Sequence, residues 1–148
     1  MVDPRRVLFL DPRANDTGPQ VDAVVAAAER DRGSDGCRDF MLVTAESERH
    51  LGLWLEQCED EVRERLVRAG GGMVNSGWST TNALTLGELV TRMSQPMFRG
   101  KTIVIVTYTA LDELATQPGV QVQGDAAEQI AQGHLDVEID AEAFSTRW

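Results

Sequence analysis

The sequence predicts a single α/β domain with a mainly parallel central sheet of about five strands and helices on both faces. Short uninterrupted apolar runs at residues 7–10, 40–43 and 103–106 are typical of strands that are buried on both faces. Segments with apolar residues at helical spacing separate these runs, and such alternation favours a parallel sheet with crossover helices. The length of 148 residues suits one domain, which we expect to span residues 1–148.

The first half of the chain alternates strand and helix. The run at 7–10 ends at Asp11-Pro12, and a helix follows from Pro19, with apolar residues at helical spacing up to about residue 32. The second run is the next predicted strand. A long helix is then predicted from Ser47 to about Ala69, because residues on one face recur at steps of three and four: Leu51, Leu55, Cys58, Val62 and Leu66.

The second half is less regular. Residues 73–82 are polar and lack both periods, which predicts a loop that contains Trp78 and leaves open a short extended piece around Val74. Thr85 and Glu88 form a capping box for a helix that Pro96 stops. Residues 103–106 are the most hydrophobic run and predict the central strand, parallel to 7–10 and 40–43. Shorter elements follow: a helix at 110–115, a strand at 120–123, a helix at 125–132 and a strand from Leu135.

The net charge limits the classes of partner. The chain carries 24 acidic and 14 basic side chains, a formal net charge of -10. Binding to nucleic acid backbones and anionic membranes depends on Lys and Arg, so both are disfavoured. No apolar run approaches the roughly 20 residues of a membrane span, and the start of the sequence does not resemble a signal peptide. We therefore expect a cytoplasmic protein with reduced cysteines.

Polar residues follow the predicted strands at their carboxyl ends, where doubly wound sheets bind ligands. These residues could bind a nucleotide or a phosphorylated metabolite, or they could simply cap helices and turns. No bound metal and no cofactor is predicted. The candidate ligand-binding residues are Asp11, Asp16, Thr17, Glu46, Ser47, Thr107 and Tyr108.

No coherent catalytic set emerges from the sequence. Residues 99–102 read Arg-Gly-Lys-Thr, like the end of a phosphate-binding loop, but position 95 is Gln95 and a predicted strand follows instead of a helix. A turn is therefore predicted there. The two histidines and two cysteines do not form a nucleophile with a base or a metal-binding set.

Four acidic residues alternate with apolar ones near the C-terminus, which on a strand places the carboxylates on one face. Such a row either protects an edge strand from pairing or receives a basic partner. Aromatic residues beside it and in the predicted loop could anchor a partner. The candidate partner-binding residues are Trp78, Asp136, Glu138, Asp140, Glu142, Phe144 and Trp148.

Two functions remain open from the sequence. The first is a non-catalytic interaction or assembly module of a soluble cytosolic or phage complex, which contacts a protein partner or itself through the acidic strand and the aromatic anchors. The alternative is a small enzyme or binding protein for a nucleotide or phosphorylated metabolite, which uses the loops at the carboxyl ends of the strands.

Overall fold

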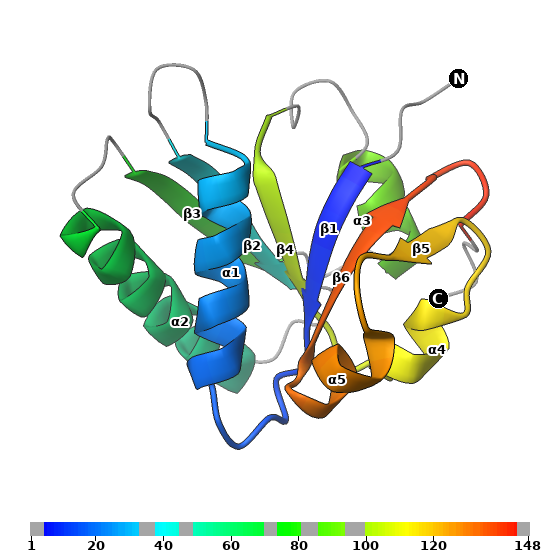
Figure 1. Cartoon of the computed structure of the whole chain (residues 1–148), viewed down its shortest axis with the longest axis horizontal. Coiled ribbons are helices and arrows are strands. Elements are labelled where there is room, and N and C mark those ends of the chain that lie inside the picture. The colour runs from blue at the N-terminus through cyan, green and yellow to red at the C-terminus, as the bar shows by residue number, and fades with distance from the viewer. Residues whose placement is uncertain are drawn as a thin grey trace.

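A computed structural model describes residues 5–32, 38–44, 49–69, 74–80, 86–93 and 100–144. Strands and helices alternate along the chain, which confirms the α/β class (Figure 1). The strands are β1 (Arg5–Leu10), β2 (Arg38–Thr44), β3 (Val74–Thr80), β4 (Thr102–Val106), β5 (Val120–Val122) and β6 (His134–Ile139). The helices are α1 (Gly18–Arg30), α2 (Arg49–Arg68), α3 (Leu86–Met93), α4 (Leu111–Ala115) and α5 (Ala126–Ala131).

The strands form one mixed sheet in the order β3-β2-β4-β1-β6-β5, so the described sheet has six strands where about five were expected. β4 lies between β1 and β2 and is parallel to both, and β3 is parallel to β2. β6 is antiparallel to both β1 and β5, so a mainly parallel sheet is not confirmed. β5 and β6 are joined by residues 123–133, a short connection that contains the six-residue helix α5, and short connections are typical of antiparallel neighbours.

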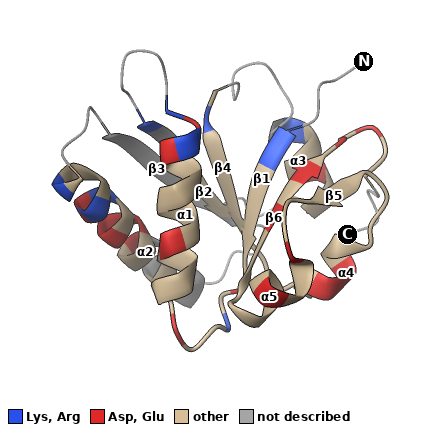
Figure 2. Ribbon diagram, in the orientation of Figure 1, with Lys and Arg blue, Asp and Glu red and all other residues tan. Residues whose placement is uncertain are grey.

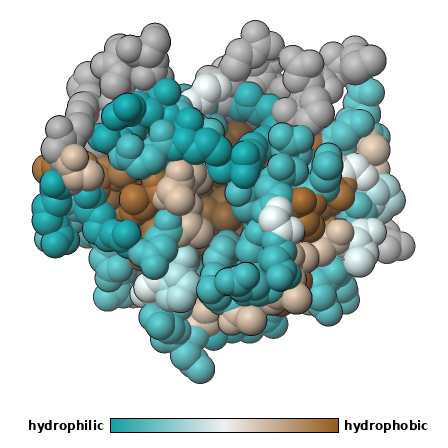
Figure 3. All heavy atoms as spheres, viewed as in Figure 1, coloured by the Kyte–Doolittle hydropathy of each residue, from teal (hydrophilic) through white to brown (hydrophobic). Residues whose placement is uncertain are grey.

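The central strands contribute side chains to two apolar clusters. Val7 and Phe9 of β1 pack in one cluster with residues of α3 and α4, whereas Leu8 and Leu10 pack in the other with residues of α1 and α2. All five residues of β4 are buried. Because successive side chains of a strand point to opposite faces of the sheet, each central strand contributes residues to both apolar clusters. Hydrophilic residues cover most of the surface in Figure 3, and the apolar residues visible there lie mainly beside α1.

The predicted loop at residues 73–82 is wrong where β3 runs. All seven residues of β3 pair in parallel with β2, from Arg38↔Val74 to Thr44↔Thr80. Its Asn, Ser, Gly and Thr residues give no apolar pattern, and the neighbouring strand supplies the hydrogen bonds that define it. Trp78 therefore lies in a strand, opposite Leu42, and its side chain is outside the described part of the chain.

The predicted acidic edge strand is also wrong. β6 lies inside the sheet between β1 and β5, so it does not form an edge. It ends at Ile139, which leaves Asp140 and Glu142 in the turn that follows. Phe144 is 4% exposed and packs in the cluster that includes Leu111 and Leu114. Alternation alone could not show that a second strand would pair on this side.

Several helix signals can be compared with the structure. Asp125 caps α5, because its carboxylate accepts a hydrogen bond from the backbone N–H of Glu128. The described part of α2 begins at Arg49, whereas Ser47 and Thr85 lie outside the described residues. None of the helices in the described ranges has the length and apolar content that crossing a membrane requires.

Two glycines with the same backbone conformation provide a test of the packing. Gly119 has φ +80 and a Cβ there would lie 2.7 Å from the Asp140 carbonyl oxygen, whereas Gly100 has φ +81 and open space. We expect Gly100→Ala to lower the free energy of unfolding by about 1 kcal/mol, the cost of the left-handed conformation alone. Gly119→Ala should cost a further 1–3 kcal/mol, approximately, because the turn must also move.

Urea unfolding of both variants measures the difference. Equal losses of stability would contradict the close packing of Gly119 against the turn that follows β6.

Candidate functional site

A hollow of about 490 Å³ lies at the carboxyl edge of the sheet, between the loop after β1 and the turn before β6. The two segments are joined by hydrogen bonds, since the backbone N–H of Asp11 donates to the Gly133 carbonyl at 3.0 Å. The side-chain amide of Gln20, which is fully buried, donates to both the Asp11 and Gly133 carbonyl oxygens at 2.8 Å. The walls of the hollow are therefore held together by α1.

The acidic residues of this hollow already have partners. The Asp11 carboxylate accepts hydrogen bonds from the backbone N–H and the Nε of Arg13 at 2.9 and 3.0 Å. The Asp16 carboxylate accepts from the backbone N–H of Gly18 at 2.9 Å. Thr17 occupies the N-cap position of α1, but its side chain makes no cap hydrogen bond. These residues shape the loop, as the capping interpretation of the sequence allows.

Thr107 and Tyr108 lie beside this loop at the end of β4. Thr107 is fully buried, its N–H donates to the Leu10 carbonyl, and its hydroxyl accepts from the N–H of Thr109 at 3.1 Å. The Tyr108 carbonyl oxygen accepts a hydrogen bond from the Arg13 guanidinium at 3.0 Å. The Cζ atom of Arg13 lies 5.8 Å from the centroid of the Tyr108 ring. Glu46 and Ser47 lie outside the described residues.

Arg13 thus connects two of the predicted residues, Asp11 and Tyr108, although it was not itself predicted from the sequence. The only feature of the sequence that could have indicated Arg13 is its position two residues after Asp11 in a turn-rich loop. One cation and two carboxylates, those of Asp11 and Asp16, give the described lining of the hollow a formal charge of minus one. This lining includes no Ser, Thr, Cys, His or Lys. The described residues contain no group of three potential metal ligands.

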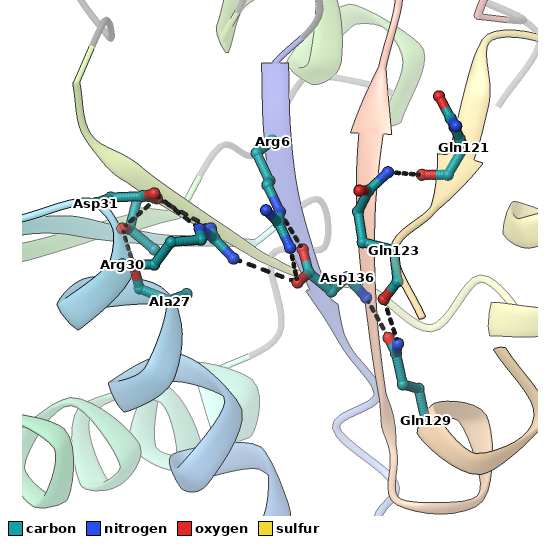
Figure 4. Close-up of polar contacts among 9 residues, drawn as sticks. Arg6, Ala27, Arg30, Asp31, Gln121, Gln123, Gln129 and Asp136 are labelled. Carbon is teal, nitrogen blue, oxygen red and sulfur yellow. Dashed lines mark hydrogen bonds and ion pairs between the residues drawn. The ribbon is translucent and has the colours of Figure 1, made fainter. Parts of the chain in front are cut away.

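A second polar cluster joins α1 to the sheet at Asp136 of β6 (Figure 4). The Asp136 carboxylate accepts from Arg6 Nε at 3.1 Å and Arg6 Nη2 at 2.8 Å, and it pairs with Arg30 Nη1 at 3.3 Å. Arg30 also donates through Nε and Nη2 to Asp31, at 2.8 and 3.0 Å. The Thr102 hydroxyl donates to Asp31 at 2.9 Å. One network therefore ties together α1, β1, β4 and β6.

In this network, hydrogen bonds and nearby opposite charges together shift the pKa values of Asp31 and Arg6 more than burial does. Burial acts to raise the pKa of Asp31, but the hydrogen bonds from Arg30 and Thr102 bring that pKa below its ordinary value. The hydrogen bond to Asp136 raises the pKa of Arg6. Both groups are held in their charged forms.

The predicted acidic row does not form a continuous strip. Asp136 is paired with Arg6 and Arg30, and Glu138 is half-buried opposite Arg6 across the β1–β6 pair. The Asp140 carboxylate accepts from the backbone N–H of Glu142 at 3.0 Å. Trp148, like the side chain of Trp78, lies outside the described residues.

Charge is instead distributed unevenly along the chain. Residues 102–144 contain no Lys or Arg. Figure 2 shows acidic residues on α4 and α5, as well as on α2 and β6, and basic residues where β1 and β4 begin. We name the exposed residues Asp112, Glu113, Asp125 and Glu128 the acidic face; none of them forms an ion pair with a described residue. The basic edge consists of Arg5, Arg6, Arg30, Arg32 and Lys101.

Cys58 is a core residue rather than a reactive one. It is 3% exposed and packs in the cluster with Val62 and Leu66. Burial, with a smaller effect from Glu61, raises the pKa of the Cys58 thiol to about 12. The thiolate is therefore scarce at neutral pH, which agrees with a structural role. Cys37 lies outside the described residues.

His134 provides a pH-dependent test of the β6 environment. It is 8% exposed, and burial lowers its pKa below 6.5 although Asp136 acts in the opposite direction. The unfolded chain therefore binds the proton first as the pH falls. We expect the free energy of unfolding to decrease from about pH 7 until the folded-state pKa is passed, and His134→Gln should reduce this slope.

The titration can also be observed directly. In a His50→Gln background His134 is the remaining histidine, so its NMR signal is unambiguous. A midpoint at or above 6.5 would contradict the buried, neutral imidazole.

The Asp136 network provides a second test. Asp136→Asn removes the carboxylate that Arg6 and Arg30 share, and these side chains are only 21–33% exposed. We expect the free energy of unfolding to fall by about 1–3 kcal/mol, because two partly buried cations lose their counter-charge. Asp112→Asn, an equal charge change on the exposed surface, should cost less than about 0.5 kcal/mol. Chemical denaturation that gives equal effects would show that the network contributes little.

The chain matches no family model, no curated protein and no solved structure. The assignment of function therefore rests on the geometry and charge described above.

Proposed function

We propose that the protein is a non-catalytic interaction module of a soluble cytoplasmic or phage complex, and that its acidic face binds a basic surface on a protein partner. The observation that carries this proposal is the acidic cluster on α4 and α5, which forms no ion pair with a described residue. Residues 102–144 lack Lys and Arg, and exposed carboxylates gather on α4 and α5. Like charges held close together raise their own electrostatic energy, which a basic partner would lower.

The acidic face is held in place by the core. Leu111 and Leu114 anchor α4, with exposures of 4% and 0%, and α4 contacts α5. Gln129 of α5 donates to the Gln123 carbonyl and accepts from the N–H of Asp136, both at 2.7 Å. The backbone that carries these carboxylates is therefore ordered before a partner binds, which lowers the entropic cost of binding.

The alternative, a small enzyme or a binding protein for a nucleotide or phosphorylated metabolite at the carboxyl edge, has less support. The carboxylates of Asp11 and Asp16 are engaged within their own loop. The formal charge of the described lining of that hollow is negative, which opposes the binding of an anion.

Self-association is a specific form of the same proposal, because the basic edge of a second copy offers a complementary surface. Such head-to-tail contact between unlike surfaces would build rings or filaments. A different basic protein would instead give a complex of defined size.

The test compares two triple variants with the same change in charge. The first, Asp112→Asn with Glu113→Gln and Glu128→Gln, neutralises the acidic face and keeps the helix cap Asp125. The control, Glu56→Gln with Asp60→Asn and Glu61→Gln, neutralises exposed positions of α2. We expect the first variant to weaken association about tenfold. Each exposed ion pair contributes a fraction of a kcal/mol to the binding free energy, and three such losses add to about 1.4 kcal/mol. The control should bind like the wild type.

Two measurements distinguish the partners. Sedimentation velocity at about 50 mM and about 500 mM NaCl detects self-association, which salt should weaken. Cross-linking in the source cells, quantified for the wild type and both variants, detects a different protein. Equal behaviour of the two triple variants in both assays would refute the assignment of the acidic face.

A further inference from the structure

A second hollow, of about 250 Å³, lies at the amino edge of the sheet, opposite the carboxyl-edge hollow. Its described lining comes from the start of β1, the end of α1 and the turn before β4. We name it the amino-edge hollow. The lining residues are Arg5, Arg6, Asp31, Gly100 and Lys101.

The sign of its charge sets this hollow apart. Three cations and one carboxylate give its described lining a formal charge of plus two, whereas the whole chain carries -10. Arg30 lies in the last turn of α1, whose C-terminus favours cations, whereas Arg5, Arg6 and Lys101 come from β1 and from the turn before β4. A concave site of one sign concentrates ligands of the opposite sign.

The Asp136 network orients one cation and leaves it donors. Arg6 has five N–H donors and uses Nε and Nη2 on Asp136, so further N–H groups remain for a ligand in the hollow. Asp31 accepts hydrogen bonds from Arg30 and Thr102, and Arg6 is likewise paired with Asp136, so both charges have partners outside the lining. The network thus fixes the orientation of the Arg6 guanidinium group before a ligand binds.

Lys101 supplies a second cation. It is the only lysine of the chain, it is half-buried, and it makes no hydrogen bond or ion pair to a residue that the structure describes. Gly100 precedes it with φ +81, and no described atom lies within 4 Å of the point that a Cβ would occupy there. The Gly-Lys-Thr sequence at 100–102 therefore contributes to this hollow as a turn into a strand, unlike the loop-to-helix geometry of nucleotide-binding loops.

We propose that the amino-edge hollow binds the phosphate group of a small phosphorylated molecule. A phosphate monoester carries a charge of about −1.5 to −2 at neutral pH, opposite in sign to the formal charge of the lining. Guanidinium and ammonium groups donate the charge-assisted hydrogen bonds that phosphate oxygens accept. This site lies apart from the acidic face and does not need a protein partner, although its cations also belong to the basic edge that self-association would use.

The experiment uses the full chain and follows the backbone amide signals of Gly100 and Lys101 by NMR. The probes are inorganic phosphate, glucose 6-phosphate and AMP, with sulfate and succinate as comparison anions at the same ionic strength. Phosphate monoesters should shift both signals saturably and bind more tightly than sulfate or succinate. The ranking of the three phosphates then indicates whether the organic group adds affinity.

Matched variants locate the site. Lys101→Gln should weaken phosphate monoester binding about tenfold, the effect of losing one charge-assisted hydrogen bond. Arg92→Gln makes the same charge change at an exposed position of α3 and should alter the affinity less than about twofold. Glu138→Gln removes an acidic neighbour of Arg6 and should strengthen binding.

Three results would overturn the proposal. The first is the absence of saturable shifts at Gly100 and Lys101 with any phosphate monoester. The second is equal affinity for sulfate or succinate, which indicates an unselective anion site. The third is an equal loss of affinity in Lys101→Gln and Arg92→Gln, which indicates a response to net charge alone.

Discussion

The burial of β1 and β4 on both faces is the constraint on which the rest of the structure depends. Their successive side chains enter two separate apolar clusters, so neither face of the central sheet is left for polar chemistry. Most polar and charged groups therefore lie at the ends of the strands and on the outer surfaces of the helices, and the Asp136 network between α1 and the sheet is the exception. Both hollows and the acidic face lie in these regions.

The direction of α1 helps to explain why the two ends of the sheet differ in charge. α1 begins at the carboxyl edge, where Asp16 lies beside its positive N-terminus, and it ends at the amino edge, where Arg30 lies beside its negative C-terminus. The same helix supplies Gln20 to one end and Arg30 to the other. Helix polarity and side-chain charge thus act in the same sense.

The sequence predicted what depends on local burial and missed what depends on pairing. The runs that became β1, β2 and β4 are apolar throughout, and their parallel arrangement followed from the intervening helices. β3 carries no such pattern, and the partner of β6 cannot be deduced from alternation. Asp136 looked like one member of an acidic row, because its partners Arg6 and Arg30 lie 130 and 106 residues away in sequence.

The Asp136 network explains why the acidic character of the C-terminal third resides on helices and not on β6. Once β6 pairs with β1, its charged residues face Arg6 and the end of α1, and the resulting contacts neutralise Asp136. The carboxylates of α4 and α5 have no such neighbours among the described residues. The pairing of β6 with β1 therefore neutralises Asp136 on the sheet, whereas the carboxylates of α4 and α5 keep their charge. The same pairing holds Arg6 in the lining of the amino-edge hollow.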